Sequence, residues 1–99
     1  MAAYVISEIE PRDTALYERY RALAPATIAR YGGRYLVRGG EADVVEGGPP
    51  AKIIVILEFP SMARAREWYR SPEYAEALKV RAGALDRRLI FVEGVPPAP

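Results

Sequence analysis

The chain of 99 residues contains no cysteine and no histidine. Without cysteine it cannot form disulfides, thiolate nucleophiles or thiolate metal sites. Without histidine it lacks the usual proton acceptor at neutral pH, the imidazole ligand of metals and the axial ligand of histidine-bound haem. We therefore expect no metal or other cofactor.

An excess of one charge and long apolar runs are also missing. Fourteen basic residues face thirteen acidic ones, a net charge of +1, which lacks the basic bias of a duplex-binding domain. No apolar run approaches the roughly 18 residues of a membrane span, and the start MAAYVISEIE lacks the basic flank and apolar block of a signal peptide. We therefore expect no nucleic-acid partner, no membrane partner and a cytoplasmic location.

Hydrophobic residues are abundant for so short a chain, at 51% of the sequence. A domain of this size buries only about two-thirds of the surface of its unfolded chain. The apolar surplus therefore predicts self-association. We expect a single domain over residues 1–94 and a flexible proline-rich tail over residues 95–99.

Alternation, periodicity and breaker residues predict four strands and two helical stretches. The first helix starts after Asp13 and ends at Gly32-Gly33, and Pro25 inside it predicts a kink or a restart. The second stretch starts after Ser61 and restarts at Ser71-Pro72. The glycine pair Gly39-Gly40 predicts a bulge or turn. The predicted strands cover residues 3–10, 34–38, 52–59 and 88–93.

The two halves of the chain resemble each other. VISEI at 5–9 recurs as VILEF at 55–59, and ERYR at 18–21 recurs as EWYR at 67–70. Each half reads strand, helix, strand, so the whole is a βαββαβ chain of the α+β class. Right-handed, un-knotted connections then favour a ferredoxin-like antiparallel sheet with its first and third strands in the middle and its helices on one face.

The other face of the predicted sheet has no helices to cover it. Burying apolar surface is worth about 25 cal/mol per Å², so a second copy of the chain is the expected cover, giving a homodimer through the sheet face. Strand alternation and the repeat assign to this face Tyr4, Ile6, Glu8, Arg34, Leu36, Arg38, Ile54, Ile56, Glu58, Leu89, Phe91 and Glu93.

Four segments carry a resemblance to a known family: AYVISEIE, YRALAPATIARYGGRYLVRGGE, ILEFPSMARAREWYRSPEY and RLIFVEG. Together they resemble the small bacterial family of domain of unknown function thirteen-thirty. The resemblance implies a dimeric α+β barrel, whose superfamily includes cofactor-free quinone-forming monooxygenases, muconolactone isomerases and haem-degrading enzymes. It transfers no catalytic residue, because this family has no established activity and the chain lacks the histidine of the haem-binding relatives.

Glu8 and Glu58 are the candidate proton carriers, because the repeat places them at corresponding positions. Two neighbouring carboxylates hold one proton between them near neutrality and can act as an acid or a base. The alternative is that each pairs with an arginine, Glu58 most simply with Arg34 or Arg38. Those arginines are also candidate anion-binding groups.

Two functions from different classes follow. The first is a cofactor-free enzyme, monooxygenase-like or isomerase-like, with a small pocket between sheet and helices for an aromatic or enolisable molecule. Glu58 and Glu8 are its candidate catalytic residues, Arg34 and Arg38 its anion-binding residues, and Trp68 and Tyr74 its walls. The second is a non-catalytic ligand-binding or assembly module in which these charges only form ion pairs. The sequence leaves open whether the protein is an enzyme.

Overall fold

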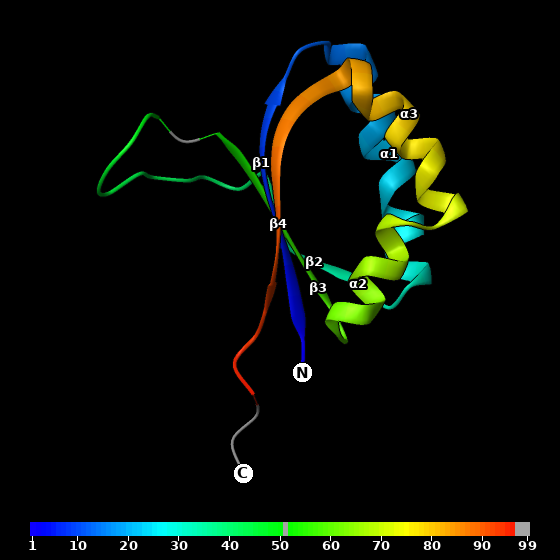
Figure 1. Cartoon of the computed structure of the whole chain (residues 1–99). Coiled ribbons are helices and arrows are strands. Elements are labelled where there is room, and N and C mark those ends of the chain that lie inside the picture. The colour runs from blue at the N-terminus through cyan, green and yellow to red at the C-terminus, as the bar shows by residue number, and fades with distance from the viewer. Residues whose placement is uncertain (51, 97–99) are drawn as a thin grey trace.

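The computed structural model describes residues 1–50 and 52–96. Within them, one antiparallel sheet has the strand order β2-β3-β1-β4, and the helices all lie on one of its faces (Figure 1). The predicted ferredoxin-like α+β fold, with the first and third strands in the middle, is confirmed. In chain order the elements are β1 (Ala3–Pro11), α1 (Thr14–Arg30), β2 (Arg34–Arg38), β3 (Ile53–Phe59), α2 (Met62–Tyr69), α3 (Pro72–Ala84) and β4 (Leu85–Glu93).

Each helix begins at the predicted capping residue. In every case a side-chain oxygen accepts a hydrogen bond from the backbone N–H three residues further on, which satisfies a donor that the first helical turn leaves free. The pairs are Asp13 with Leu16 (3.0 Å), Ser61 with Arg64 (3.2 Å) and Ser71 with Tyr74 (3.1 Å).

Helix α1 runs through Pro25 as one element, so of the two predicted alternatives the restart is wrong and the kink stays a prediction. Proline has no N–H, and the carbonyl of Arg21, four residues earlier, therefore loses its helical donor. The Arg38 Nη2 atom donates a hydrogen bond to that carbonyl at 2.8 Å. A side chain from β2 thus replaces the missing helical hydrogen bond.

The end of α1 agrees with the prediction. The N–H groups of Gly32 and Gly33 donate to the carbonyls of Ala29 and Ile28 at 3.0 and 2.9 Å. Gly32 has a φ of +81°, which favours glycine, and a Cβ atom on Gly33 would lie 2.6 Å from the Phe59 ring. The glycine pair therefore both ends the helix and lets β2 approach β3.

The register of β4 corrects its predicted face. Ser7 of β1 lies opposite Leu89, and residues directly opposite in an antiparallel pair share a face. Leu89, Phe91 and Glu93 therefore lie on the helix-covered face, and the prediction for them is wrong. The strand begins at Leu85, which is 1% exposed and fixes which alternate residues point inward. The open face receives Arg88, Ile90 and Val92 instead.

A β-bulge at Leu36 corrects the predicted face of Arg38. Arg34 lies opposite Glu58 on the open face, as predicted, but the ladder then shifts by one residue, so Arg38 lies opposite Val55. Val55 belongs to the helix-covered face. Because one extra residue reverses the alternation, the expectation that Arg38 lies on the open face is wrong.

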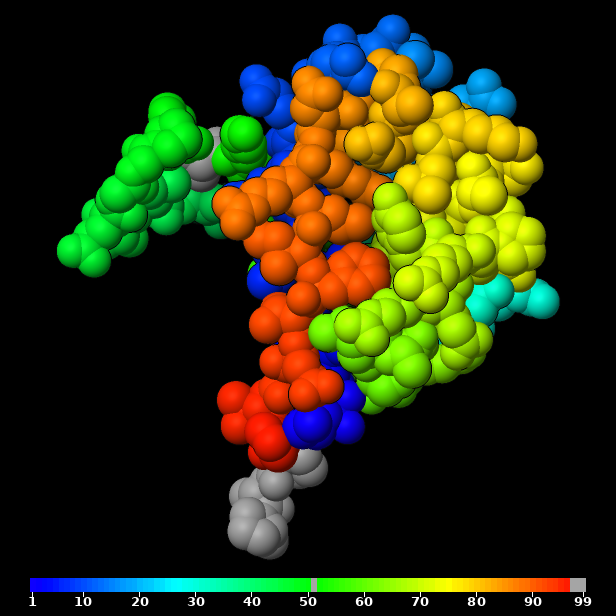
Figure 2. Space-filling view, in the orientation of Figure 1, coloured from blue at the N-terminus to red at the C-terminus, as the bar shows by residue number. Residues whose placement is uncertain are grey.

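The segment after β2 turns away from the body of the protein. Gly39 has a φ of +73° and forms the predicted turn, whereas the bulge itself lies earlier, at Leu36. Residues 41–50 are exposed and project on the side of the sheet opposite the helices (Figures 1 and 2). They do not cover the helix side of the sheet.

The core lies between the helices and the sheet. Its largest fully buried side chains are Trp68, Tyr74, Phe59, Leu85 and Val5. In the described part of the chain, no helix has the length and apolar character needed to cross a bilayer. Of the predicted flexible tail, residues 97–99 lie outside the described residues.

Candidate functional site

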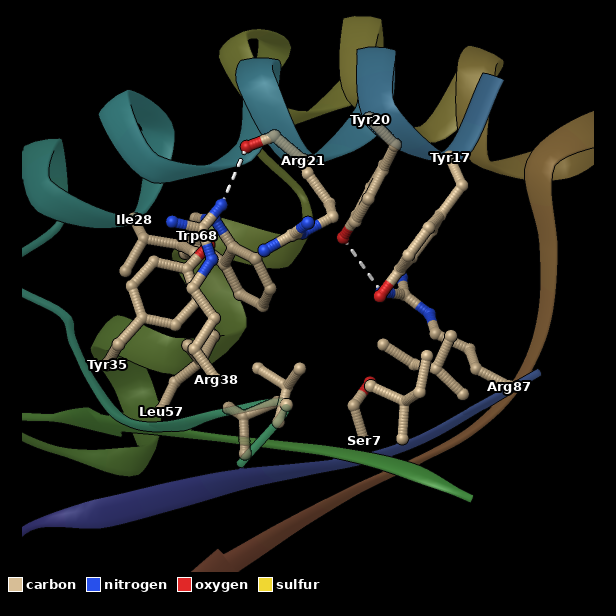
Figure 3. A pocket seen from close by; sticks show the side chains of 15 residues that line it. Ser7, Tyr17, Tyr20, Arg21, Ile28, Tyr35, Arg38, Leu57, Trp68 and Arg87 are labelled. Carbon is tan, nitrogen blue, oxygen red and sulfur yellow. Dashed lines mark hydrogen bonds between the residues drawn. The ribbon is translucent and has the colours of Figure 1, made fainter. Parts of the chain in front are cut away.

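A cavity of about 180 Å³ lies between helix α1 and the helix-covered face of the sheet (Figure 3). This is the layer in which the sequence predicts a pocket. Strands β1 and β3 supply an apolar floor, and α1 and α2 contribute further apolar walls. The apolar lining consists of Val5, Ile9, Ile53, Val55, Leu57, Ile28 and Trp68.

The polar lining consists of hydroxyl and guanidinium groups. Among the described residues, no carboxylate lines the cavity. Since guanidinium groups are always charged at neutral pH, the cavity has a surplus of positive charge and of hydrogen-bond donors. These groups belong to Ser7, Tyr17, Tyr20, Tyr35, Arg21, Arg38 and Arg87.

Arg87 of β4 is held by two phenols. Its Nη1 atom donates to the Tyr20 hydroxyl and its Nη2 atom to the Tyr74 hydroxyl, both at 2.9 Å, and the two hydroxyls also hydrogen-bond each other. Burial raises the pKa of Tyr74, and the neighbouring Tyr20 raises it further, against the opposing effect of Arg87. For Arg87, burial disfavours the charged form, but Tyr20 and Tyr74 together shift its pKa upward. At neutral pH the Tyr74 phenol therefore keeps its proton beside the Arg87 cation.

Arg38 of β2 lies at the opposite edge of the cavity. Its guanidinium lies 4.6 Å from the centre of the Tyr35 ring and donates to the carbonyl of Arg21. Burial raises the pKa of Tyr35, with the positive charge of Arg38 opposing this shift. The Arg21 guanidinium is 3.3 Å from Glu18, whereas Arg38 and Arg87 have no ion pair within the described part of the chain.

The structure separates the predicted site residues into two groups. Arg38 and Trp68 line the cavity, and Tyr74, 0% exposed, lies behind the lining with its hydroxyl on Arg87. Glu8, Glu58 and Arg34 lie on the opposite face of the sheet. The predicted set therefore does not form one site.

The two carboxylates do not approach each other. Glu58 lies opposite Tyr4 and Glu8 opposite Ile54, so the two are offset by four residues along neighbouring strands, about 13 Å. The expectation of a shared proton is wrong. Strands β1 and β3 are antiparallel, so equivalent positions of the two repeats lie at different distances along the strand pair. Glu58 instead pairs with Arg34, at 2.8 Å, which was the alternative. A separate catalytic role for either carboxylate stays a prediction.

The most important residue that the sequence analysis missed is Arg87. The sequence predicts a last strand that starts at residue 88, whereas the strand begins three residues earlier, at Leu85. A pattern in the sequence does indicate three of the other lining residues. Residues three and four apart share one face of a helix, and this spacing joins Tyr17, Tyr20 and Arg21. Ser7 is also indicated, because it places a hydroxyl at an inward position of a strand, where it is 5% exposed.

Comparisons with known proteins place the chain in a family without assigning a reaction. Residues 2–95 match the family described as Domain of unknown function (DUF1330). No curated protein matches the sequence.

Several solved structures share the fold. RPA0582, a protein of unknown function from Rhodopseudomonas palustris, is 25% identical with a TM-score of 0.79, over 97% of this chain and 84% of that one. SnoaB, a cofactor-independent oxygenase from Streptomyces nogalater, is 12% identical with a TM-score of 0.69, over 99% and 97%. A dimeric ferredoxin-like protein of unknown function from Bacteroides fragilis is 16% identical with a TM-score of 0.60, over 94% and 96%.

Proposed function

Because this chain belongs to the DUF1330 family, whose description names no activity, we propose its function from the cavity itself. The protein binds a small aromatic or enolisable molecule as its anion, a carboxylate, phenolate or enolate, and transforms it without a cofactor. The cavity between the sheet and α1 is the site. The reaction is either monooxygenase-like or isomerase-like. In the first case dioxygen is the oxidant, a ring CH₂ group becomes a carbonyl and the second oxygen atom leaves as water; in the second case a proton moves within the substrate.

The observation that carries this proposal is the charge of the lining. Three guanidinium groups face the cavity, no carboxylate of the described residues does, and Arg38 and Arg87 have no acidic partner there. Arg87 is partly buried, and Arg38 is exposed at the edge of the cavity. An anionic ligand would give both groups a counter-ion, and guanidinium groups bind carboxylates and enolates through paired hydrogen bonds.

The size of the cavity limits the ligand. A cavity of about 180 Å³ is slightly larger than the roughly 150 Å³ that holds a molecule of benzene in a protein core. The apolar floor and the indole of Trp68 offer flat contact surfaces to such a ring. A single ring with small polar substituents therefore suits the space.

The same guanidinium groups would assist the chemistry. An aromatic alcohol or an enolisable lactone becomes reactive when it loses a proton, here to water, and positive charge around the resulting oxygen lowers the pKa of the substrate. SnoaB, which shares the fold, is a cofactor-independent oxygenase, and this similarity supports a reaction without a cofactor.

One observation favours the second candidate, a binding module without turnover. The cavity offers no carboxylate in the described residues, and burial raises the pKa of the Tyr35 and Tyr74 phenols, so neither phenol is ready to accept a proton at neutral pH. In this case the protein holds the anion and does not change it.

We also propose that two copies associate through the open face of the sheet. That face carries Ile6, Ile54, Ile56, Ile90 and Val92, and Val92 is 42% exposed. Contact with a second copy would remove this surface from water. A protein from Bacteroides fragilis that shares the fold is dimeric, which supports the association of two copies but does not specify the face.

A thermal-shift experiment tests the proposal. Benzoate, 4-hydroxybenzoate, hydroquinone and a small lactone are the probes, and benzyl alcohol is the neutral control. A ligand present at 100 times its Kd stabilises the native state by about 2.7 kcal/mol. The two ring acids, benzoate and 4-hydroxybenzoate, should therefore raise the melting temperature, and benzyl alcohol should not. If none of the acids raises it, the proposal is wrong. Binding without oxygen uptake or isomerisation would favour the module.

A further inference from the structure

Two guanidinium groups of the cavity, which have no ion pair among the residues that the structure describes, lie on opposite edges of the sheet. Arg38 comes from β2 and Arg87 from β4, with β3 and β1 between them. Three strand spacings separate the two backbones by about 14 Å, and both side chains extend toward the space between. Figure 3 shows them on different sides of the cavity, Arg38 beside Tyr35 and Arg87 below Tyr17.

Each guanidinium is fixed in place and still has free donors. Arg38 uses one N–H group on the carbonyl of Arg21, and it is this carbonyl that Pro25 deprives of its helical donor. Arg87 uses one Nη atom on each of the Tyr20 and Tyr74 hydroxyls. A guanidinium has five N–H donors, so both groups retain donors for a ligand.

The surface between the two guanidinium groups is mainly apolar. By the register of the sheet, Val55, Ile53 and Ile9 form the floor there, and the hydroxyl of Ser7 is a polar exception. A polar substituent in the middle of the ligand would lose its hydration against this floor, whereas a ring would not. The cavity therefore has an apolar centre and a cationic group at either end.

From this arrangement we infer that the ligand is a single-ring molecule with two acidic groups on opposite sides of the ring, one bound by Arg38 and the other by Arg87. This inference rests on the proposed function and narrows it from any ring-sized anion to a two-ended one. A dicarboxylate and a hydroxy acid that ionises when bound both belong to this class.

Isothermal titration calorimetry on the full chain can test the inference with two probes of equal ring size. Benzene-1,4-dicarboxylate presents two acidic groups, and benzoate presents one. We expect the dicarboxylate to bind at least tenfold more tightly than benzoate. Arg38→Gln and Arg87→Gln should each reduce its affinity to about that of benzoate.

The control variant is Arg19→Gln, which removes one positive charge from an exposed position of α1 outside the cavity lining. It should leave the tenfold preference unchanged, which separates local contact from net charge. Because Arg87 is partly buried, Arg87→Lys serves as a second variant. It keeps the charge but cannot bind both phenols and the ligand as a fork, so the preference should fall while the fold is retained.

The possible results distinguish this inference from the proposed function. If the dicarboxylate binds no more tightly than benzoate, or if Arg38→Gln leaves its affinity unchanged, the two-ended ligand is wrong and a one-ended anion site remains. If neither acid binds to the wild-type chain, both the inference and the proposed function fail.

Discussion

The two faces of the sheet are built from the same strands, yet they differ in whether their charged side chains have partners of opposite charge. On the open face Arg34 and Glu58 form an ion pair at 2.8 Å, and Glu8 lies opposite Arg88. On the helix-covered face Arg38 and Arg87 have no acidic partner among the described residues. Charges that neutralise each other fix a surface, whereas unpaired charges in a cavity are available to a ligand. The comparison therefore supports the two proposals made above, self-association through the open face and ligand binding at the covered one.

The largest predicted effect is on the free energy of unfolding, and it should distinguish two neighbouring residues of β3 that point to opposite faces. Leu57 is 4% exposed in the core, so Leu57→Ala should lower the free energy of unfolding by about 2–5 kcal/mol. Ile56 faces the open side, and Ile56→Ala should mainly weaken self-association. Urea denaturation and analytical ultracentrifugation measure the two effects. Equal losses of stability at a concentration where the chain is monomeric would contradict the difference between the faces.

The next largest effects, on stability and on ligand affinity, should follow from changing the hydrogen bond between Arg38 and α1. Pro25→Ala restores a helical donor to the Arg21 carbonyl, and we expect it to raise the free energy of unfolding by about 1–3 kcal/mol, because proline is unfavourable inside a helix. The same change lets the carbonyl return to its helical partner. Affinity for a ring acid should therefore fall several-fold, as measured by calorimetry.

A double variant shows whether Pro25 acts through Arg38. In an Arg38→Gln background, Pro25→Ala should still stabilise the helix but should not change the affinity further. A further loss of affinity in that background would mean that Pro25 shapes the cavity by another route.

A smaller effect should appear at alkaline pH. Burial raises the pKa of Tyr74 above its value in the unfolded chain, near 10, so the native state keeps a proton that the unfolded state releases. Stability from this group is fully present below about pH 10 and falls as the pH rises further, by up to about 1.4 kcal/mol per pH unit. Tyr74→Phe should flatten this alkaline slope. A slope identical to that of the wild type, measured by denaturation at several pH values, would show that Tyr74 ionises as it does in the unfolded chain.

The smallest effect on stability should come from Glu58→Gln. The ion pair with Arg34 is partly exposed, with 24% of the Glu58 side chain and 69% of the Arg34 side chain accessible, so its loss should change the free energy of unfolding by less than about 1 kcal/mol. Binding of ring acids should persist, because Glu58 points away from the cavity. If Glu58 is nevertheless a catalytic residue, turnover is abolished while the dimer remains, and the chemistry then belongs to the open face.

Much of the fold could be predicted because its signals are local. The caps Asp13, Ser61 and Ser71 act within one helical turn, and the apolar run of β3 identifies a central strand by composition alone. The absence of cysteine and histidine excludes whole classes of chemistry before any fold is known.

The site was decided by the tertiary structure. One extra residue at Leu36 turns Arg38 from the open face into the cavity, and the start of β4 at Leu85 brings Arg87 to the opposite edge. Strand alternation has a period of two, so the sequence determines which residues alternate, but only the pairing with neighbouring strands decides which set points inward. The chain by itself therefore determined the order of its elements and the chemical groups available, and the register of the sheet decided which of those groups meet.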